Sequence, residues 1–429
     1  MASNKLIRVF EHQSIKLEQV IEDITFDKAT LDALQRHYGE NGVPYYSLIN
    51  NGVKFNEFVG VIQIGNTVIE VLPKADNTSN ESKENKKKWQ TILVKMLAAV
   101  GLFDVHSTSD SSLKLKANSI LDLYFALFVK EVEYLLHSGL TKQYRKKEAN
   151  LTTLKGSLQF GKHIQQNLTH QERFYVQHTT YDVDHKLHHI LYKALRLLKQ
   201  INTNSDLHAR IGALLLNFPE MPDIKVTEAT FDKLVFSRKT QSYKQAIDIA
   251  KLLLLNYHPD ILTGRNNVLA LMFDMNVLWE RFVFVSLSKY KANHGIETIS
   301  AQQSKPFWKP VGGQTSMMRP DIVINQNTDN CVVLDTKWKN LNGYNPSPDD
   351  LRQMYVYHEY FNAKRVALIY PSSNGVTKEI KGEYSKSPTK KEEELVNVCS
   401  VISLKTEDNI QEWQHNIFKS VSDYISFGK

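Results

Sequence analysis

The chain has 429 residues, enough for two or three domains with cores of their own. Its 53 Lys and Arg against 46 Asp and Glu give a net charge of +7, a mild excess that is compatible with a polyanionic partner. The only cysteines, Cys331 and Cys399, exclude a disulfide framework and a cysteine-based zinc site. No segment has the apolar core of a signal peptide or the length of a membrane span, so we expect a cytoplasmic protein without a membrane partner.

Residues 1–75 predict a small β-rich domain, because runs of β-branched and aromatic residues alternate with turn residues such as Gly65-Asn66. This segment contains no obvious catalytic set, and its expected role is to bind a partner. Strands are expected at residues 5–11, 45–49, 54–64 and 67–72, with a helix at 27–38.

Residues 76–88 are polar and end in three lysines, which predicts a linker or long loop. Residues 89–267 predict a mainly helical region, because Leu, Ile, Phe and Tyr recur at helical spacing. The expected helices are residues 89–105, 121–137, 186–200, 206–216 and 243–255.

Two motifs in the helical region imitate functional sites. The segment 156–163 (GSLQFGKH) approaches a phosphate-binding loop, but His163 stands where a Ser or Thr is needed to bind Mg²⁺. His185 and His189 have the i, i+4 spacing of metal ligands but lack the glutamate of a metalloprotease helix. Residues 141–162 also hold six lysines and arginines against one glutamate, which favours equally a phosphate-binding patch and an ordinary exposed face.

The most informative stretch lies in residues 268–429, the predicted catalytic domain. Residues 319–324 and 332–339 have strand composition and flank a polar turn, which predicts a hairpin. Such a hairpin places Asp321 at the start of one strand and Asp335 near the end of its neighbour. Asp335 and Lys337 are two apart and therefore share a face.

Two carboxylates and a lysine that meet in this way suit phosphodiester hydrolysis. Mg²⁺ prefers oxygen ligands, and one or two carboxylates with substrate phosphate oxygens form a typical site. Such an ion neutralises charge on the phosphate, and a nearby lysine stabilises the transition state. The alternative is that Asp-x-Lys is simply a common sequence at a strand end.

The following helix strengthens the catalytic interpretation. Ser347 is a good N-cap, and Gln353 and Tyr357 share one helix face at i, i+4. Gln-x-x-x-Tyr after an Asp-x-Lys strand resembles the RecB-like branch of the PD-(D/E)xK nuclease superfamily. That branch often has a helical acid near its metals, and Glu280, on a predicted helix at 273–283, occupies this position. The alternative for these three residues is a solvated polar helix face.

The remaining elements of this domain complete an α/β arrangement, so the chain as a whole is predicted to be α+β. Residues 382–394 are charged and expected to be exposed. Further strands are expected near 296–300, at 365–370 and at 398–404, and a terminal helix at 411–425.

Four segments carry a more specific resemblance than Asp-x-Lys. They are residues 58–66 (FVGVIQIGN), 69–74 (IEVLPK), 273–276 (FDMN) and 334–339 (LDTKWK). Together they resemble the McrC family, the nuclease subunits of McrBC systems that restrict DNA containing 5-methylcytosine.

This resemblance implies a double-stranded DNA endonuclease of the restriction-endonuclease-like fold. It implies that Asp321, Asp335 and Glu280 bind Mg²⁺ and that Lys337 is catalytic, with Gln353 and Tyr357 in support. It also implies an N-terminal part that docks on a hexameric AAA+ GTPase of the McrB type and stimulates GTP hydrolysis. Two other hypotheses stay open: a stand-alone RecB-like nuclease in repair or defence, and a non-catalytic activator with a vestigial site.

Overall fold

The computed structural model describes residues 5–40, 42–74, 82–101, 119–258, 267–291, 296–339, 341, 345–372, 375–385 and 398–426. They form two compact units, one between residues 114 and 271 and one that combines residues 5–113 with residues 272–429. The N-terminal β-rich segment therefore folds together with the C-terminal segment that carries the predicted catalytic residues. The predicted four-part division of the chain stays a prediction. Among the described helices, none combines the length and apolar character that crossing a bilayer requires.

The N-terminal part of the second unit is β-rich, as the turn and strand patterns predict. Strand β1 pairs in parallel with β8, and β8 pairs antiparallel with β7 across the turn at Gly65. The elements are β1 (Lys5–Phe10), β2 (Ser14–Lys16), β3 (Val20–Ile21), β4 (Ile24–Thr25), α1 (Lys28–Tyr38), β5 (Tyr46–Ile49), β6 (Gly52–Phe55), β7 (Phe58–Ile64) and β8 (Thr67–Leu72).

Helix α2 (Lys83–Ala99) corrects the linker predicted at 76–88. The prediction is wrong over residues 83–88, and residues 76–81 lie outside the described part of the chain. Ser82 caps the helix by accepting a hydrogen bond from the backbone N–H of Asn85. Lys86 is buried, and its Nζ donates to the backbone carbonyl of Arg8 at 2.7 Å. The lysine-rich run is thus a helical face, and one of its lysines is satisfied by tertiary contacts that composition does not show.

The C-terminal part of the same unit is built on a six-stranded sheet with the order β14-β17-β18-β19-β21-β20. Strands β18, β19 and β21 run parallel in its centre, and the other neighbours are antiparallel. The elements are α9 (Met275–Tyr290), β14 (Ile299–Ala301), β15 (Lys305–Trp308), β16 (Ser316–Met318), β17 (Ile322–Ile324), β18 (Val332–Thr336), α10 (Pro348–Phe361), β19 (Arg365–Pro371), β20 (Lys378–Glu383), β21 (Val398–Leu404) and α11 (Ile410–Ser426).

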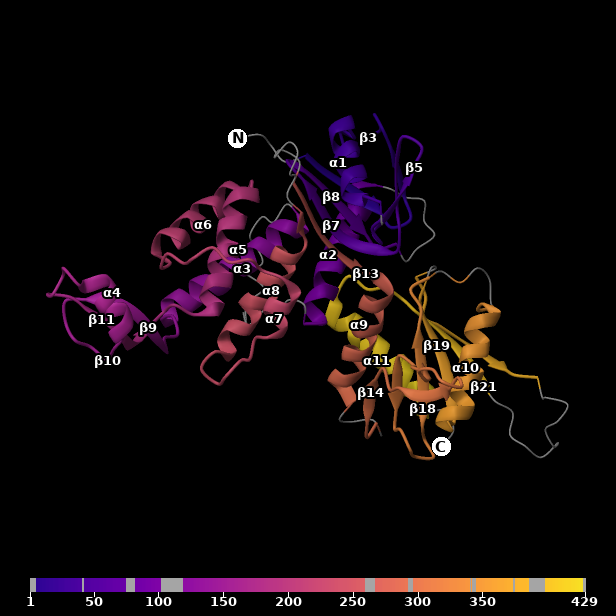
Figure 1. Cartoon of the computed structure of the whole chain (residues 1–429). Helices are drawn as coiled ribbons and strands as arrows, with labels where there is room; N and C mark the ends of the chain where they lie inside the picture. The colour runs from indigo at the N-terminus through magenta and orange to yellow at the C-terminus, as the bar shows by residue number, and fades with distance from the viewer. Residues whose placement is uncertain are drawn as a thin grey trace. The chain divides into compact units, whose positions relative to one another are not determined.

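Helices cover this sheet on both faces. Helix α10 packs Met354, Tyr357 and Phe361 against Val333 and Leu368. Helices α9 and α11 lie together (Figure 1) and form an aromatic cluster in which the Trp279 and Trp413 rings are 5.7 Å apart. Two boundaries differ from prediction: α9 begins at Met275, after a strand, and β20 occupies part of the segment expected only to be exposed and charged.

The other unit is mainly helical but also holds a three-stranded sheet, with the order β10-β11-β9, that the helical pattern did not indicate; this sheet and α4 are called the arm below. Strands β9 and β11 pair antiparallel over their full length. They escaped prediction because β9 (QYRKKEANL) is largely polar and does not alternate with buried residues. The elements are α3 (Ile120–Ser138), β9 (Gln143–Leu151), β10 (Ser157–Leu158), α4 (Phe160–Asn167), β11 (Phe174–Asp182), α5 (Lys186–Ile201), α6 (Ser205–Asn217), α7 (Glu228–Asp232), a 3₁₀ turn (Gln241–Tyr243), α8 (Lys244–Leu255), β12 (Tyr257–His258) and β13 (Val268–Asp274), which leads out of the unit.

Candidate active site

The predicted hairpin is present and brings the two aspartates together. Ile322 of β17 pairs with Leu334 of β18, so Asp321 lies beside Asp335 at the next position along the two strands. The Asp321 carboxylate is held in place by Thr336, whose backbone N–H and hydroxyl donate to Oδ2 at 2.6 and 2.8 Å. The spatial arrangement on which the sequence hypothesis depends is therefore found in the fold.

Lys337 completes the group from the end of β18. Its Nζ lies 2.8 Å from Oδ2 of Asp335, and the Asp335 side chain is almost fully buried. Asp335 shares its face of the strand with Val333, which belongs to the core beneath α10. A buried carboxylate thus meets a partly buried ammonium group at the edge of an apolar core.

Helix α10 contributes the polar groups that surround Lys337. Nζ of Lys337 donates to Oε1 of Gln353 at 3.4 Å, and Nε2 of Gln353 donates to the Tyr357 hydroxyl at 2.8 Å. The helix starts where predicted, because Ser347 accepts from the Asp350 backbone N–H and a proline follows it. Gln353 and Tyr357 are therefore part of one hydrogen-bonded chain with Lys337, as i, i+4 spacing predicts.

Glu280 lies on α9 and is electrostatically coupled to this group. Its Oε1 accepts from Nε2 of Gln302 at 2.8 Å, and Gln302 in turn accepts from Arg319. Burial raises the pKa of Glu280, and the charge of Asp321 raises it further. The charges of Glu280 and Asp321 therefore interact.

The two aspartates compete for ionisation. Burial, with the charge of Asp321, raises the pKa of Asp335 to about 7. Burial also raises the pKa of Asp321, against the effect of its hydrogen bonds from Thr336. Burial acts to lower the pKa of Lys337, but the carboxylates of Asp335 and Asp350 outweigh it, and the net pKa is raised. Lys337 is consequently a cation, suited to stabilising negative charge rather than to accepting a proton.

A divalent cation would relieve the crowding of these carboxylates. Oδ2 of Asp335 is buried and accepts no hydrogen bond of good geometry from the described residues, although Nζ of Lys337 is close. No group of three or more acidic, His or Cys ligands poised for a metal occurs among the described residues. The fit is therefore to an ion held by Asp321 and Asp335 with the substrate phosphate, a pattern typical of Mg²⁺.

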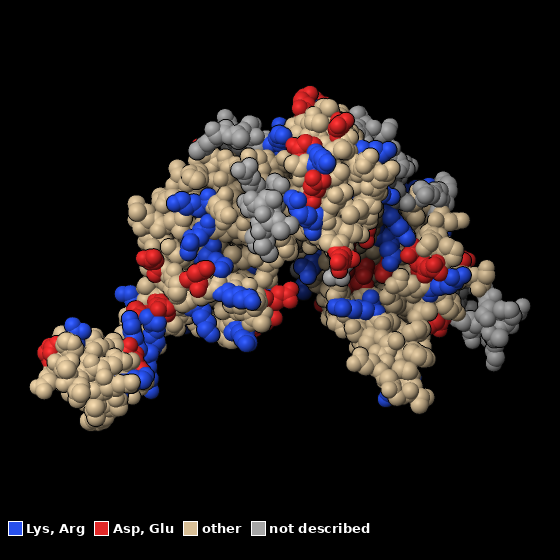
Figure 2. Space-filling view, turned by 45° about the horizontal axis from the view of Figure 1, so that its top comes forward, with Lys and Arg blue, Asp and Glu red and all other residues tan. Residues whose placement is uncertain are grey.

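The other motifs of the sequence have structural roles. His185 caps α5 by accepting from the Leu187 backbone N–H, and Nε2 of His189 lies 2.7 Å from an Asp184 oxygen. The near-P-loop occupies β10 and the start of α4, on the arm. In Figure 2 the lobe formed by this arm carries basic side chains along its stem and few charges over its tip. Arg145 and Lys162 there are paired with acids.

Comparison with known proteins decides the family. The model of the McrBC 5-methylcytosine restriction system component matches residues 53–371, well over half of the chain. The chain belongs to this McrBC component family. No curated protein matches it.

Two solved structures share the fold of this McrBC family member. One is the refined half-complex from a tetradecameric assembly of Thermococcus gammatolerans McrB AAA+ hexamers with bound McrC. It matches with a TM-score of 0.72 and 20% identity, covering 98% of this chain and 100% of that one. The other is the cryo-EM structure of the Thermococcus gammatolerans McrBC complex, with a TM-score of 0.50 and 20% identity over 68% of this chain and 89% of that one. At this identity the likeness shows the fold.

The candidate site also contains a residue that the sequence did not single out, Asp350. Asp350 lies 3.8 Å from Nζ of Lys337 and 2.6 Å from Nζ of Lys339. Burial acts to raise the pKa of Asp350, but its hydrogen bonds from Lys339 and Ser347 outweigh this and lower it. From the sequence alone, Asp350 is only one of two acids in the first turn of the helix. The sequence feature that could have indicated Asp350 is its position three residues before Gln353 on the same helix. This spacing places both side chains on the helix face that contacts Lys337.

Proposed function

We propose that this chain is the DNA-cleaving subunit of an McrBC-type restriction complex, a Mg²⁺-dependent endodeoxyribonuclease of the PD-(D/E)xK superfamily. The observation that carries the proposal is the meeting of Asp321, Asp335 and Lys337 at the ends of two neighbouring strands. There, an ion pair of 2.8 Å joins Lys337 to a buried Asp335. Perturbed, buried titratable groups of this kind are characteristic of active sites.

Each of these residues has a separate proposed role in hydrolysis. Asp321 and Asp335 would hold Mg²⁺, which would supply charge neutralisation at the scissile phosphate and make a nearby water easier to deprotonate. Glu280, which forms no three-ligand group with them among the described residues, would act as a supporting acid near the ion. The Lys337 ammonium group stabilises the charge that develops on the phosphate oxygens. Gln353, anchored by Tyr357, keeps the lysine aimed at that position.

The partner proposed for this chain is a hexameric AAA+ GTPase of the McrB type. In the Thermococcus gammatolerans assembly the AAA+ hexamers carry bound McrC. Double-stranded DNA is the proposed substrate, and the partner would hydrolyse the nucleotide, because the near-P-loop of this chain has His163 in place of Ser or Thr. In this proposal the chain stimulates GTP hydrolysis as well as cutting.

The test separates cutting from partner activation. Asp335→Asn and Lys337→Ala should abolish cleavage of 5-methylcytosine-containing duplex by the reconstituted complex, while leaving its stimulated GTP hydrolysis unchanged. Lys364→Ala, which removes an exposed lysine before β19, is the control and should cut normally. Unimpaired cutting by both site variants would refute the nuclease assignment. Cutting by the purified wild-type chain without partner or GTP would indicate a stand-alone nuclease instead.

A further inference from the structure

A small hairpin next to the candidate active site exposes an unusual number of apolar side chains. It consists of β15 and β16, which within the described part of the chain pair only with each other. Trp308 is 60% exposed and Phe307 48% exposed, on β15; Met317, on β16, is 50% exposed. Exposed clusters of this kind on a soluble surface mark a site of interaction.

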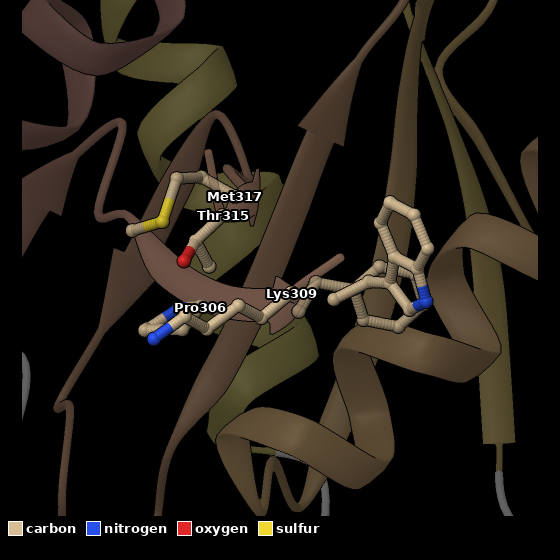
Figure 3. Close-up of a pocket in the computed structure, with 6 residues that line it drawn as sticks. Pro306, Lys309, Thr315 and Met317 are labelled. Carbon is tan, nitrogen blue, oxygen red and sulfur yellow. The ribbon is translucent and has the colours of Figure 1, made fainter. Parts of the chain in front are cut away.

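The exposed side chains border a hollow of about 490 Å³. Figure 3 shows Thr315 and Met317 on one side of this hollow and Pro306 and Lys309 on the other. The hollow is thus lined by aromatic and apolar groups with one cation. Such a lining suits a ligand with a flat, polarisable ring, which can stack on the aromatic side chains, and a nearby negative charge, which can pair with the lysine.

The hairpin is directly continuous with the catalytic strand. Only two residues separate the end of β16 at Met318 from Asp321, a span of about 10 Å at most. Hydrogen bonds also tie this connection to α9, because Arg319 donates to Gln302 and Gln302 donates to Glu280. Trp308 pairs with Ser316, five positions before Asp321, so a duplex that places one phosphate at Asp321 can reach the exposed rings within about five base pairs, at about 3.4 Å each.

The charge of the hairpin selects nucleic acid among the possible occupants. Residues 301–320 contain two lysines and one arginine and no acid. Nζ of Lys305 is engaged with the Tyr360 carbonyl at 3.1 Å, whereas Lys309 is exposed on the rim of the hollow. A two-stranded β-ribbon also has the width that the major groove of duplex DNA admits.

We propose that the β15–β16 hairpin is a DNA-contacting ribbon that binds the duplex beside the cut. Trp308 and Phe307 pack against base or sugar faces, and Lys309 contacts a phosphate. This rests on the proposed function, because DNA must lie at Asp321 for the hairpin to reach it. The hairpin would hold the duplex in register with the catalytic group without taking part in the chemistry.

The experiment measures binding of the full-length chain to a fluorescent 30-base-pair duplex as a function of salt. The Asp335→Asn background prevents cutting. Trp308→Ala should weaken binding about tenfold, as expected for loss of one aromatic–base contact, while leaving the salt dependence unchanged. Trp308→Phe should restore most of the affinity. Lys309→Ala should instead reduce the slope of log K against log salt by about 0.9.

Tyr134→Ala is the matched control, because Tyr134 on α3 is exposed to a similar degree, 58%, and should leave binding unchanged. Unchanged affinity in both Trp308→Ala and Phe307→Ala would overturn the proposal. So would a shift of Trp308→Ala from dimer to monomer with the same affinity per monomer, since the hairpin would then join two copies of the chain. If Lys337→Ala still cuts DNA, the catalytic assignment of that lysine fails, whereas the DNA contact of the hairpin is refuted only by unchanged affinity in the Trp308 and Phe307 variants.

Discussion

Glu11 offers a test of how the N-terminal strands are joined to the segment that carries the candidate site. It follows β1 directly and is 3% exposed. Its Oε1 accepts from the Lys74 backbone N–H and from Nε1 of Trp338, both at 2.7 Å. Its Oε2 is buried and accepts no hydrogen bond from the described residues. The carboxyl group is thus half satisfied, which favours its neutral form.

Burial raises the pKa of Glu11 from 4.5 to about 7, and the charges of Glu57 and Asp274 add to this. The folded state therefore binds the Glu11 proton more tightly than the unfolded state, and stability falls as pH rises from 4.5 through 7. The difference of about 2.5 pKa units, at 1.36 kcal/mol each, corresponds to about 3 kcal/mol lost by pH 8. Glu11→Gln keeps an acceptor for Lys74 and Trp338 and cannot ionise.

We therefore expect Glu11→Gln to be more stable than wild type by about 3 kcal/mol at pH 8 and by only a few tenths at pH 4.5. Urea unfolding followed by tryptophan fluorescence measures this selectively, because all five tryptophans belong to the unit that contains Glu11. Glu412→Gln, on the exposed side of α11, is the control and should change stability at neither pH. A stability difference independent of pH, or a less stable Gln variant at pH 8, would refute the reasoning.

Three further predictions concern the candidate site. Because Asp335 has a pKa of about 7, Mg²⁺ must displace its proton at lower pH; calorimetry without DNA should show affinity falling up to tenfold per pH unit below 7 and levelling above it. Tyr357→Phe removes the hydroxyl that anchors Gln353 and should slow cleavage about fivefold, measured as kcat at saturating DNA, with unchanged stability of the DNA complex. Ser347→Ala removes the N-cap of α10 and should lower the free energy of unfolding by about 1 kcal/mol, measured by urea titration.

The local part of the site could be predicted because each of its features has a short-range signal. Polar turn residues between two β-branched runs predict the hairpin that joins β17 and β18. Ser347 followed by proline predicts the start of α10, and the i, i+4 spacing then places Gln353 with Tyr357. These signals depend on backbone geometry within a few residues, so they survive without knowledge of the rest of the fold.

Features that depend on long-range contacts could not be predicted in the same way. Nothing near Glu11 indicates that its partner is Trp338, more than 300 positions away. The lysine run before Trp89 looks like a solvated loop until the burial of Lys86 against Arg8 is known. Strand β9 is polar because its partner β11 supplies the hydrogen bonds while much of its surface stays in water. In each case the deciding partner lies elsewhere in the chain.

The alternation of β18 explains why one short motif serves both chemistry and architecture. Asp335 and Lys337 lie on the face covered by α10, where Gln353 and Asp350 meet the lysine. Trp338 points to the opposite face. Its ring lies 5.4 Å from that of Trp279 on α9, and its indole N–H donates to Glu11. The residue that follows Lys337 is therefore held between α9 and the end of β1. Lys337 and Trp338 follow β18 directly, and the Lys337 backbone N–H still donates to Ile369 of β19. Successive side chains therefore keep pointing to opposite faces, and holding Trp338 on one face fixes the direction of Lys337 on the other.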